Sequence, residues 1–403
     1  MPKPNIPEDA PLAGVRVADF SRVLAGPFCT RILADLGAEV IKVEPPDGDL
    51  SRRLGARRGG MSGYYMQQNC GKLNVSIDLR SSRGAELARR LVERSDILVE
   101  NFRPGVMESL GLGQKPLREL NPSLIYCAIS GFGHDSPWRD RRAFAGIAHA
   151  ATGMLHRQAT AGRNDPVDSV LAVGDTTSGM QAVIAILAAL RMRERTGTGQ
   201  FIDMAMHDAL LATQEAANFH LFSDETTEHD FLSSWIYRCG DEFIAVPDDP
   251  RAHWEKFTAL MEAPELLTDV RYNDHIKRAA VLDELEALIQ GWIAAQESAS
   301  QVVARLHAAG MPAARIVTMS EALESEQTQA REMTREIEDR CGNCVPVLDS
   351  PYRYSDASAG VRGVPAFRGE DNREVLSEVL GLDEKAIEDL ERAGVISARV
   401  PEN

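Results

Sequence analysis

The first 130 residues alternate between short apolar segments and longer amphipathic ones, and this alternation constrains the fold more than any other feature. Apolar runs of strand length cover residues 12–20, 40–43, 73–79, 97–100 and 124–129. Helical patterns lie between them, and the first opens at Pro27 and ends at Gly37, the usual places of these two residue types. Strands that alternate with helices predict an α/β fold built on a doubly wound, mostly parallel sheet. Its ligand loops would lie at the carboxyl ends of the strands.

The pattern of predicted strands and helices changes after a polar stretch at residues 223–230. Residues 235–239 and 243–246 flank a Gly-Asp turn and predict a small antiparallel pair of strands. Helical patterns follow at about 251–262, 279–295 and 299–309, and a final helical pair at 372–380 and 383–393. We therefore predict three parts: a large domain of residues 1–224, a smaller α+β domain of residues 225–330, and a C-terminal segment of residues 331–403.

The charge balance narrows the kinds of partner. The 403 residues include 60 acidic and 44 basic side chains, for a net charge of -16, which argues against nucleic acid or an anionic membrane as the main partner. No apolar run approaches the length of a membrane span. The first ten residues are polar and rich in proline, without the order of charges and apolar residues seen in a signal peptide. The expected location is the cytoplasm.

Several familiar site motifs are missing from the sequence. Cys341 and Cys344 form a single C-x-x-C motif with no nearby histidine, so two incidental thiols on a turn are expected rather than a metal site. No histidine pair has metal-ligand spacing. His149 and His156 could reach a pocket, but a position in the core or on the surface is the favoured interpretation. The chain has neither a G-x-G-x-x-G motif after the first strand, nor a P-loop, nor a G-x-S-x-G elbow. We therefore expect no metal and no ordinary dinucleotide site.

Arginines follow several of the predicted strands. Arg22, Arg80 and Arg103 each lie at or just after a strand end, where together they could hold a phosphate or a carboxylate. The alternative is that each is a solvated surface side chain.

A single carboxylate lies among small residues in the segment AVGDTTSGM, residues 172–180. This segment separates a strand-like run at 170–173 from a long apolar helix. Gly174 would let another molecule approach the backbone closely, and the start of the helix would favour an anion. Two interpretations of Asp175 follow: the N-cap of the helix, or a nucleophile.

Five motifs in order give this chain a specific resemblance. It resembles the class III CoA-transferases, the family of formyl-CoA:oxalate and carnitine CoA-transferases. The likeness is dense through about residue 220. The motifs that carry it are PLAGVRVADFSRVLAGP at residues 11–27, LGAEVIKVEP at 36–45, VENFRPGV at 99–106, GDTTSGM at 174–180 and RTGTGQ at 195–200.

The resemblance implies a reaction and a set of site residues. Asp175 would attack the thioester carbonyl of an acyl-CoA to form a mixed anhydride. CoA thiolate would then return to make an aspartyl-CoA thioester, from which an acceptor carboxylate takes the CoA. Backbone N–H groups at Gly174 and Thr176 would stabilise the oxyanions. Coenzyme A would enter as a substrate thioester and lie across loops that hold Arg22, Val23, Ala25, Ile77, Arg80, Asn101, Phe102 and Arg103. Similar proteins are interlocked homodimers in which the C-terminal segment returns to the large domain.

Departures from the family patterns narrow the substrate. Related racemases carry a proton-transferring His-Asp pair where this chain has Phe144 and Ala145, so racemisation is not expected. Leu24 stands where formyl-CoA:oxalate enzymes have glutamine, and with Phe144 it is expected in the acyl pocket. These features favour transferases that take succinyl-CoA. The alternatives are an isomerase of the same fold, a nucleotide-dependent oxidoreductase, and a CoA-binding regulator without catalysis.

Overall fold

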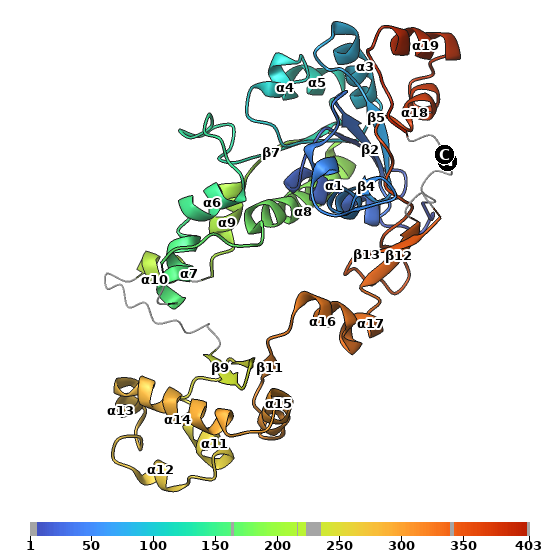
Figure 1. Ribbon diagram of the computed structural model, residues 1–403. Coiled ribbons are helices and arrows are strands. Elements are labelled where there is room, and N and C mark those ends of the chain that lie inside the picture. Colours follow the sequence, from blue (N-terminus) through green and yellow to red (C-terminus); the bar gives the residue numbers. More distant parts are fainter. Residues whose placement is uncertain (1–5, 163–164, 216, 223–234, 339–341, 401–403) are drawn as a thin grey trace. The chain divides into compact units, whose positions relative to one another are not determined.

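The computed structural model describes residues 6–162, 165–215, 217–222, 235–338 and 342–400. The chain forms two compact units (Figure 1). One consists of Met1–Asp224 with Gln329–Asn403, and the other of Glu225–Thr328.

The first unit is built on a six-stranded sheet in which every neighbouring pair of strands is parallel. The strand order is β5-β2-β1-β6-β7-β8. The chain therefore winds outward from β1 to one edge and then returns to β6, beside β1, before it winds to the other edge. The strands are β1 Arg16–Asp19, β2 Glu39–Glu44, β5 Lys72–Ser76, β6 Ile97–Glu100, β7 Ile125–Ser130 and β8 Phe201–Ala205.

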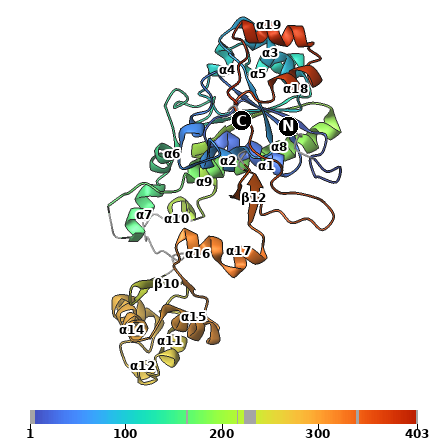
Figure 2. The ribbon, with the colours of Figure 1, turned by 45° about the vertical axis from the view of Figure 1, so that its right-hand side comes forward.

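Two helical layers cover the two faces of this sheet, because alternate residues of each strand point to opposite faces. Ala18, Ile41 and Leu98 pack under α3, α5, α18 and α19, whereas Val17, Val40 and Ile97 pack under α1 and α8. The two layers are visible in Figures 1 and 2. The helices are α1 Ala25–Asp35, α3 Ser82–Glu93, α4 Val106–Ser109, α5 Gln114–Leu120, α8 Val173–Thr196, α18 Asn372–Glu378 and α19 Glu384–Arg392.

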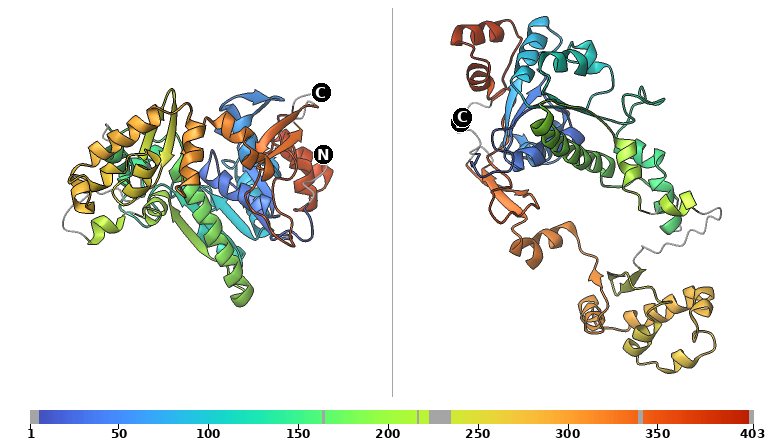
Figure 3. Two further views of the ribbon diagram at one scale, coloured as in Figure 1. Left: turned by 90° about the horizontal axis from the view of Figure 1, so that it is seen from below. Right: turned by 180° about the vertical axis from the view of Figure 1, so that it is seen from behind.

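The remaining elements of this unit lie around the sheet (Figure 3). A short hairpin and a helix follow β2, and a second hairpin precedes the C-terminal helices. They are the 3₁₀ helix η1 Leu50–Arg53, β3 Arg57–Arg58, β4 Met61–Ser62, α2 Gly63–Asn69, α6 Ala145–Ala151, α7 Met154–Gly162, α9 Met206–Ala212, α10 Ala217–Phe222, β12 Thr334–Glu338 and β13 Cys344–Leu348.

The second unit has its own apolar core. An antiparallel sheet in the order β11-β10-β9 packs against α11, α14 and α15 around the buried Trp254, Phe257 and Leu285. Its elements are β9 Trp235–Cys239, β10 Glu242–Val246, α11 Trp254–Leu260, α12 Glu265–Thr268, α13 His275–Ala280, α14 Leu282–Ala294, α15 Ala299–Ala308, β11 Ala314–Arg315, α16 Met319–Glu324 and α17 Glu326–Ala330. The sequence predicted β9 and β10 closely but missed α12 and α13.

Two sequence-based expectations about the segment around Asp175 are wrong. The run at 170–173 is no strand: Val170 is fully exposed, and α8 already begins at Val173. In addition, α8 is by length and composition apolar enough to cross a membrane, although no such segment was expected. Packing accounts for part of this composition, because α8 lies with α1 against the sheet.

Candidate active site

The loops that follow β1 and β6 meet at the carboxyl end of the sheet, where the winding direction reverses. The backbone N–H of Arg22 donates to Oδ1 of Asn101 at 2.7 Å, and Nδ2 of Asn101 donates to the carbonyl of Arg22 at 2.8 Å. The Arg22 guanidinium lies 5.3 Å from the centre of the Phe102 ring. Such a switch point is where α/β sheets of this kind bind ligands.

A cavity of about 450 Å³ opens beside these loops, a volume within the usual range for ligand sites. We call it the Arg22 cavity. Three residues of the predicted CoA set line it, namely Arg22, Arg80 and Phe102. Ile77 does not: it is buried in the core and bridges to Ile396. The structure thus gives the Ile77 side chain a packing role, while Arg103 is exposed outside the lining.

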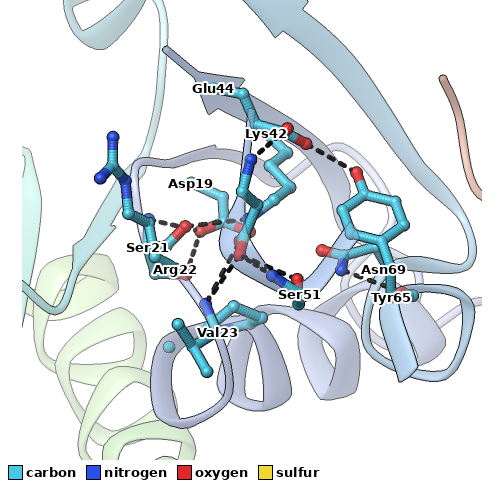
Figure 4. Close-up of polar contacts among 12 residues, drawn as sticks. Asp19, Ser21, Arg22, Val23, Lys42, Glu44, Ser51, Tyr65 and Asn69 are labelled. Carbon is cyan, nitrogen blue, oxygen red and sulfur yellow. Dashed lines mark hydrogen bonds and ion pairs between the residues drawn. The ribbon is translucent and has the colours of Figure 1, made fainter. Parts of the chain in front are cut away.

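The loop after β1 has an unusual backbone at Val23, whose φ is 64°. A β-branched residue avoids this left-handed region, so the surroundings must hold it there. The holding group is the buried Asp49 carboxylate, which accepts the Val23 N–H at 3.2 Å (Figure 4). Asp49 also accepts both the N–H and the hydroxyl of Ser51 and lies 3.1 Å from Nζ of Lys42.

Lys42 ties this carboxylate to the same loop. Its ammonium donates to the carbonyl of Ser21 at 2.8 Å, and its side chain is fully buried. Burial works against the charged form, but Asp49, Asp19 and Glu44 together raise the pKa of Lys42 above its usual value. A buried ion pair is costly to break. The pair of Lys42 and Asp49 therefore fixes the backbone of the loop from Ser21 to Leu24 through its contacts with Ser21 and Val23.

Asp175 lies in the first turn of α8 rather than at its N-cap, which is Ala172. The backbone N–H groups of Ala25 and Ala145, the first residues of α1 and α6, act on its carboxyl group, as does its own N–H. Burial raises the pKa of Asp175, whereas these N–H groups and the charge of His149 favour its ionised form. The starts of three helices therefore converge on one carboxylate.

Two glycines let α8 approach its neighbours around Asp175. A Cβ at Gly179 would lie 2.7 Å from the carbonyl oxygen of Ala25, and one at Gly174 would lie 2.9 Å from Sδ of Met206. Real Cβ atoms do not make contacts this short. Gly179 thus allows the close contact between α8 and the start of α1, and Gly174 allows the one between α8 and α9.

The N–H groups predicted to stabilise an oxyanion are already engaged. Gly174 N–H donates to Nε2 of His149 at 3.0 Å, and Thr176 N–H donates to the Ala172 carbonyl at 3.1 Å. This corrects the expectation from sequence, which placed both groups next to the substrate. The backbone N–H groups that favour the ionised form of the Asp175 carboxyl belong to Ala25, Ala145 and Asp175 itself.

His149 is buried beside Asp175, whereas the sequence left it open between a pocket and a position in the core or on the surface. It is 1% exposed, and its Nδ1 lies 3.1 Å from Oδ1 of Asp168. A carboxylate at Nδ1 favours a proton there, which leaves Nε2 to accept the Gly174 N–H. The pair is 19 residues apart in the chain, and no motif spacing points to it. His149 thus connects Asp168 to the residue next to Asp175.

Three other side chains lie near this carboxylate or its neighbours. Burial and, after it, the charge of Asp175 raise the pKa of Tyr64 on α2, which the sequence did not suggest. Leu24 is buried and is the N-cap residue of α1, and Phe144 is the N-cap residue of α6 with 71% of its surface exposed. Both thus directly precede the residues whose N–H groups reach Asp175.

Metal ligands were not expected, and the described residues hold no group of three His, Cys, Asp or Glu side chains that could bind a metal ion. Cys344 is exposed on β13, but Cys341 lies outside the described residues, so the C-x-x-C pair has no structural description.

Glu100 at the end of β6 is expected to make folding stability depend on pH. Its carboxyl group accepts the Phe102 N–H at 2.7 Å. Burial, with smaller contributions from the charges of Glu108 and Asp203, nevertheless raises its pKa to about 8, against the Phe102 N–H and the charge of His134. The folded protein therefore keeps a proton that the unfolded chain releases, so stability falls as pH rises from about 4.5 to about 8.

Glu100→Gln, which resembles the protonated acid, should flatten this profile. The expected gain over the wild type near the upper end of the range is on the order of 2–4 kcal/mol in the free energy of unfolding. Urea unfolding midpoints measured between about pH 5 and pH 8 would test this. The two proteins should be equally stable near the lower end, and parallel profiles would show that Glu100 is not the responsible group.

Comparison with known proteins agrees with the motifs. Residues 12–372 match the model of CoA-transferase family III. A succinyl-CoA–D-citramalate CoA-transferase of Chloroflexus aurantiacus is 34% identical over 96% of this chain and 98% of its own. A formyl-CoA:oxalate CoA-transferase of Streptomyces avermitilis is 32% identical over 96% and 99%. The crystal structure of a CAIB/BAIF family protein from Brucella suis aligns with a TM-score of 0.81 and 30% identity over 92% of this chain and 100% of that one. The resemblance inferred from sequence is confirmed.

Proposed function

This chain belongs to CoA-transferase family III and is an acyl-CoA:carboxylate CoA-transferase, and we propose that it transfers CoA through covalent intermediates on Asp175, with succinyl-CoA as donor. The observation that carries the proposal is the arrangement at the start of α8. A partly buried carboxylate there lies beside the N–H groups of Ala25 and Ala145, which favour its ionised form, and the loop that holds Ala25 also holds Arg22 in the wall of a cavity.

In the first half of the proposed reaction, an Asp175 oxygen attacks the thioester carbonyl carbon of the donor. The C–S bond breaks, CoA leaves as thiolate, and a mixed anhydride remains on Asp175. The thiolate then attacks the Asp175 carbonyl carbon and expels the donor acid as a carboxylate. The enzyme now carries CoA as a thioester of Asp175, so neither ATP nor water is consumed.

The second half reverses these steps with a new acid. The acceptor carboxylate attacks the aspartyl-CoA thioester, thiolate leaves, and an anhydride joins the acceptor to Asp175. Thiolate attack on the acceptor carbonyl then yields the new acyl-CoA and frees the Asp175 carboxylate. Each addition places negative charge on a carbonyl oxygen next to the Ala25 and Ala145 N–H groups, which makes these the proposed oxyanion donors.

We propose that the nucleotide end of CoA occupies the Arg22 cavity. Arg22 and Arg80 in its wall suit the phosphates, and the Phe102 ring suits contact with the adenine face. The loop of residues 22–25 would then connect the bound nucleotide with Asp175. The choice of succinyl-CoA is supported by Leu24 and by the name of the Chloroflexus relative. The formyl-CoA:oxalate relative has a similar identity, so identity alone does not select the donor.

The proposal includes an interlocked homodimer. Three apolar side chains are exposed on α8, namely Met180, Ile184 and Leu187. Phe144, which directly precedes Ala145 of the candidate site, is exposed as well. Exposed apolar surface of this kind is typical of an interface. Three to four residues separate the members on α8, so they share one helix face.

The test is a screen of the full-length protein with acyl-CoA donors and mono- or dicarboxylate acceptors, read by mass. We expect a new acyl-CoA that requires both a donor and an acceptor, forms without ATP, and is made fastest from succinyl-CoA. Light scattering on the same preparation should give about twice the chain mass of 44.1 kDa. Hydrolysis alone, or deuterium entering the α-carbon of the donor without an acceptor, would contradict CoA transfer and favour a hydrolase or an isomerase.

A further inference from the structure

A second cavity, of about 340 Å³, adjoins the Arg22 cavity and shares Pro46 and Asp47 with it. Five arginines line it, and we call it the arginine pocket. They come from η1, from β3 and from two segments near the C-terminus, and they are Arg52, Arg53, Arg57, Arg368 and Arg399. This gathering is unexpected in a chain whose net charge is -16.

Two of these arginines face each other across a backbone bridge. Arg368 and Arg399 form an antiparallel β-bridge, in which the Arg399 N–H donates to the Arg368 carbonyl at 2.8 Å. Like charges at directly opposed positions destabilise such a pair. The Arg368 guanidinium has neutral partners, the hydroxyls of Ser76 at 2.8 Å and Ser397 at 2.6 Å. Burial lowers the pKa of Arg368, and the charges of Arg52 and Arg399 add to this effect, whereas those of Glu44 and Asp47 oppose it.

The positive charge of the pocket exceeds the negative charge available there. Glu44 binds Arg52 through two contacts of 2.8 Å, and Asp47 is the acidic residue of the lining. Arg53 and Arg57 donate only to carbonyl oxygens, at 3.5 and 3.4 Å. No described residue forms an ion pair with Arg53, Arg57 or Arg399. Among the residues that the structure describes, five arginines against the carboxylates of Glu44 and Asp47 leave an excess of three positive charges at the pocket.

We propose that the arginine pocket binds a phosphate group. Planar guanidinium groups recognise phosphate oxygens with paired hydrogen bonds, and a doubly charged phosphate would offset the repulsion between Arg368 and Arg399. The phosphate has two possible sources. One is the 3′-phosphate of the CoA whose nucleotide occupies the neighbouring Arg22 cavity, a source that rests on the proposed function. The other is free inorganic phosphate.

The experiment compares the binding of CoA, dephospho-CoA and inorganic phosphate by calorimetry, using the full-length protein without an acceptor acid. The variant is Arg53→Gln/Arg57→Gln, because both side chains are exposed and contact only carbonyl oxygens. The control, Arg94→Gln/Arg191→Gln, removes the same charge at exposed positions outside both cavities.

For the 3′-phosphate source, the wild type and the control should bind CoA about tenfold or more tightly than dephospho-CoA. The Arg53→Gln/Arg57→Gln variant should lose this preference. If the ligand is instead free inorganic phosphate, CoA and dephospho-CoA should bind with equal affinity. Inorganic phosphate should then bind to the wild type and to the control but not to the Arg53→Gln/Arg57→Gln variant. Equal binding of all three ligands to variant and wild type would overturn the proposal. The experiment measures binding and not turnover. A negative result would therefore contradict the phosphate site without contradicting CoA transfer, and failure of CoA transfer would not by itself contradict the phosphate site.

Discussion

Asp175→Asn is expected to lower the rate of CoA transfer by about 10⁴-fold or more while leaving the fold and the affinity for CoA almost unchanged. The amide has the shape of the carboxyl group and keeps one acceptor oxygen for the N–H groups of Ala25 and Ala145. It cannot attack a thioester to form an anhydride. The residues that line the Arg22 cavity do not include Asp175, so the binding of CoA should persist.

Intact-protein mass spectrometry extends this prediction to the intermediate. Wild-type protein with a donor acyl-CoA should gain the mass of CoA less one water, because one carboxyl oxygen leaves with the donor acid, and hydroxylamine should convert that adduct into a hydroxamate on Asp175. The matched control is Asp208→Asn, which changes an exposed aspartate in the first turn of another helix, α9. The control should transfer CoA and form the adduct like the wild type. Transfer at the wild-type rate by Asp175→Asn would rule out Asp175 as the nucleophile.

The sequence predicted the parallel sheet because its strands are buried on both faces and therefore appear as continuous apolar runs. Residues 97–100 illustrate this, since the prediction and β6 coincide. The same rule failed at 170–173, where an apolar run is exposed instead of paired. An apolar pattern alone does not distinguish a strand that pairs in the sheet from a segment whose apolar residues are exposed.

The site was predictable where the topology of the sheet brings loops together. Arg22 and Asn101 were expected at strand ends, and the adjacency of β1 and β6 joins them. Side-chain partners were less predictable. Lys42, in the run predicted as a strand at 40–43, is buried against Asp49, a partner that its sequence does not indicate. His149 reaches Gly174 only because of how α6 packs near α8. Such contacts depend on the packing of distant segments, which periodicity does not encode.

His149→Leu is expected to lower kcat for CoA transfer by about 10- to 100-fold, with little change in KM for the acyl-CoA. Leucine fills a similar volume but leaves the buried Gly174 N–H without its acceptor, which costs about 1–3 kcal/mol. Gly174 precedes Asp175 in the first turn of α8, so the nucleophile should lose its orientation. KM should hold because His149 is not in the lining of the Arg22 cavity.

His149→Gln separates this positioning role from a general effect on stability. Its amide oxygen can accept the Gly174 N–H while its amide nitrogen donates to Asp168, as the two imidazole nitrogens do in the wild type. We therefore expect the glutamine variant to recover most of the kcat and of the aspartyl-CoA adduct that the leucine variant loses. Steady-state kinetics corrected for the folded fraction, measured by circular dichroism, would test this. If the corrected kcat of His149→Leu equals that of the wild type, His149 acts only on stability. If glutamine restores nothing, the hydrogen bond to Gly174 is not what positions Asp175.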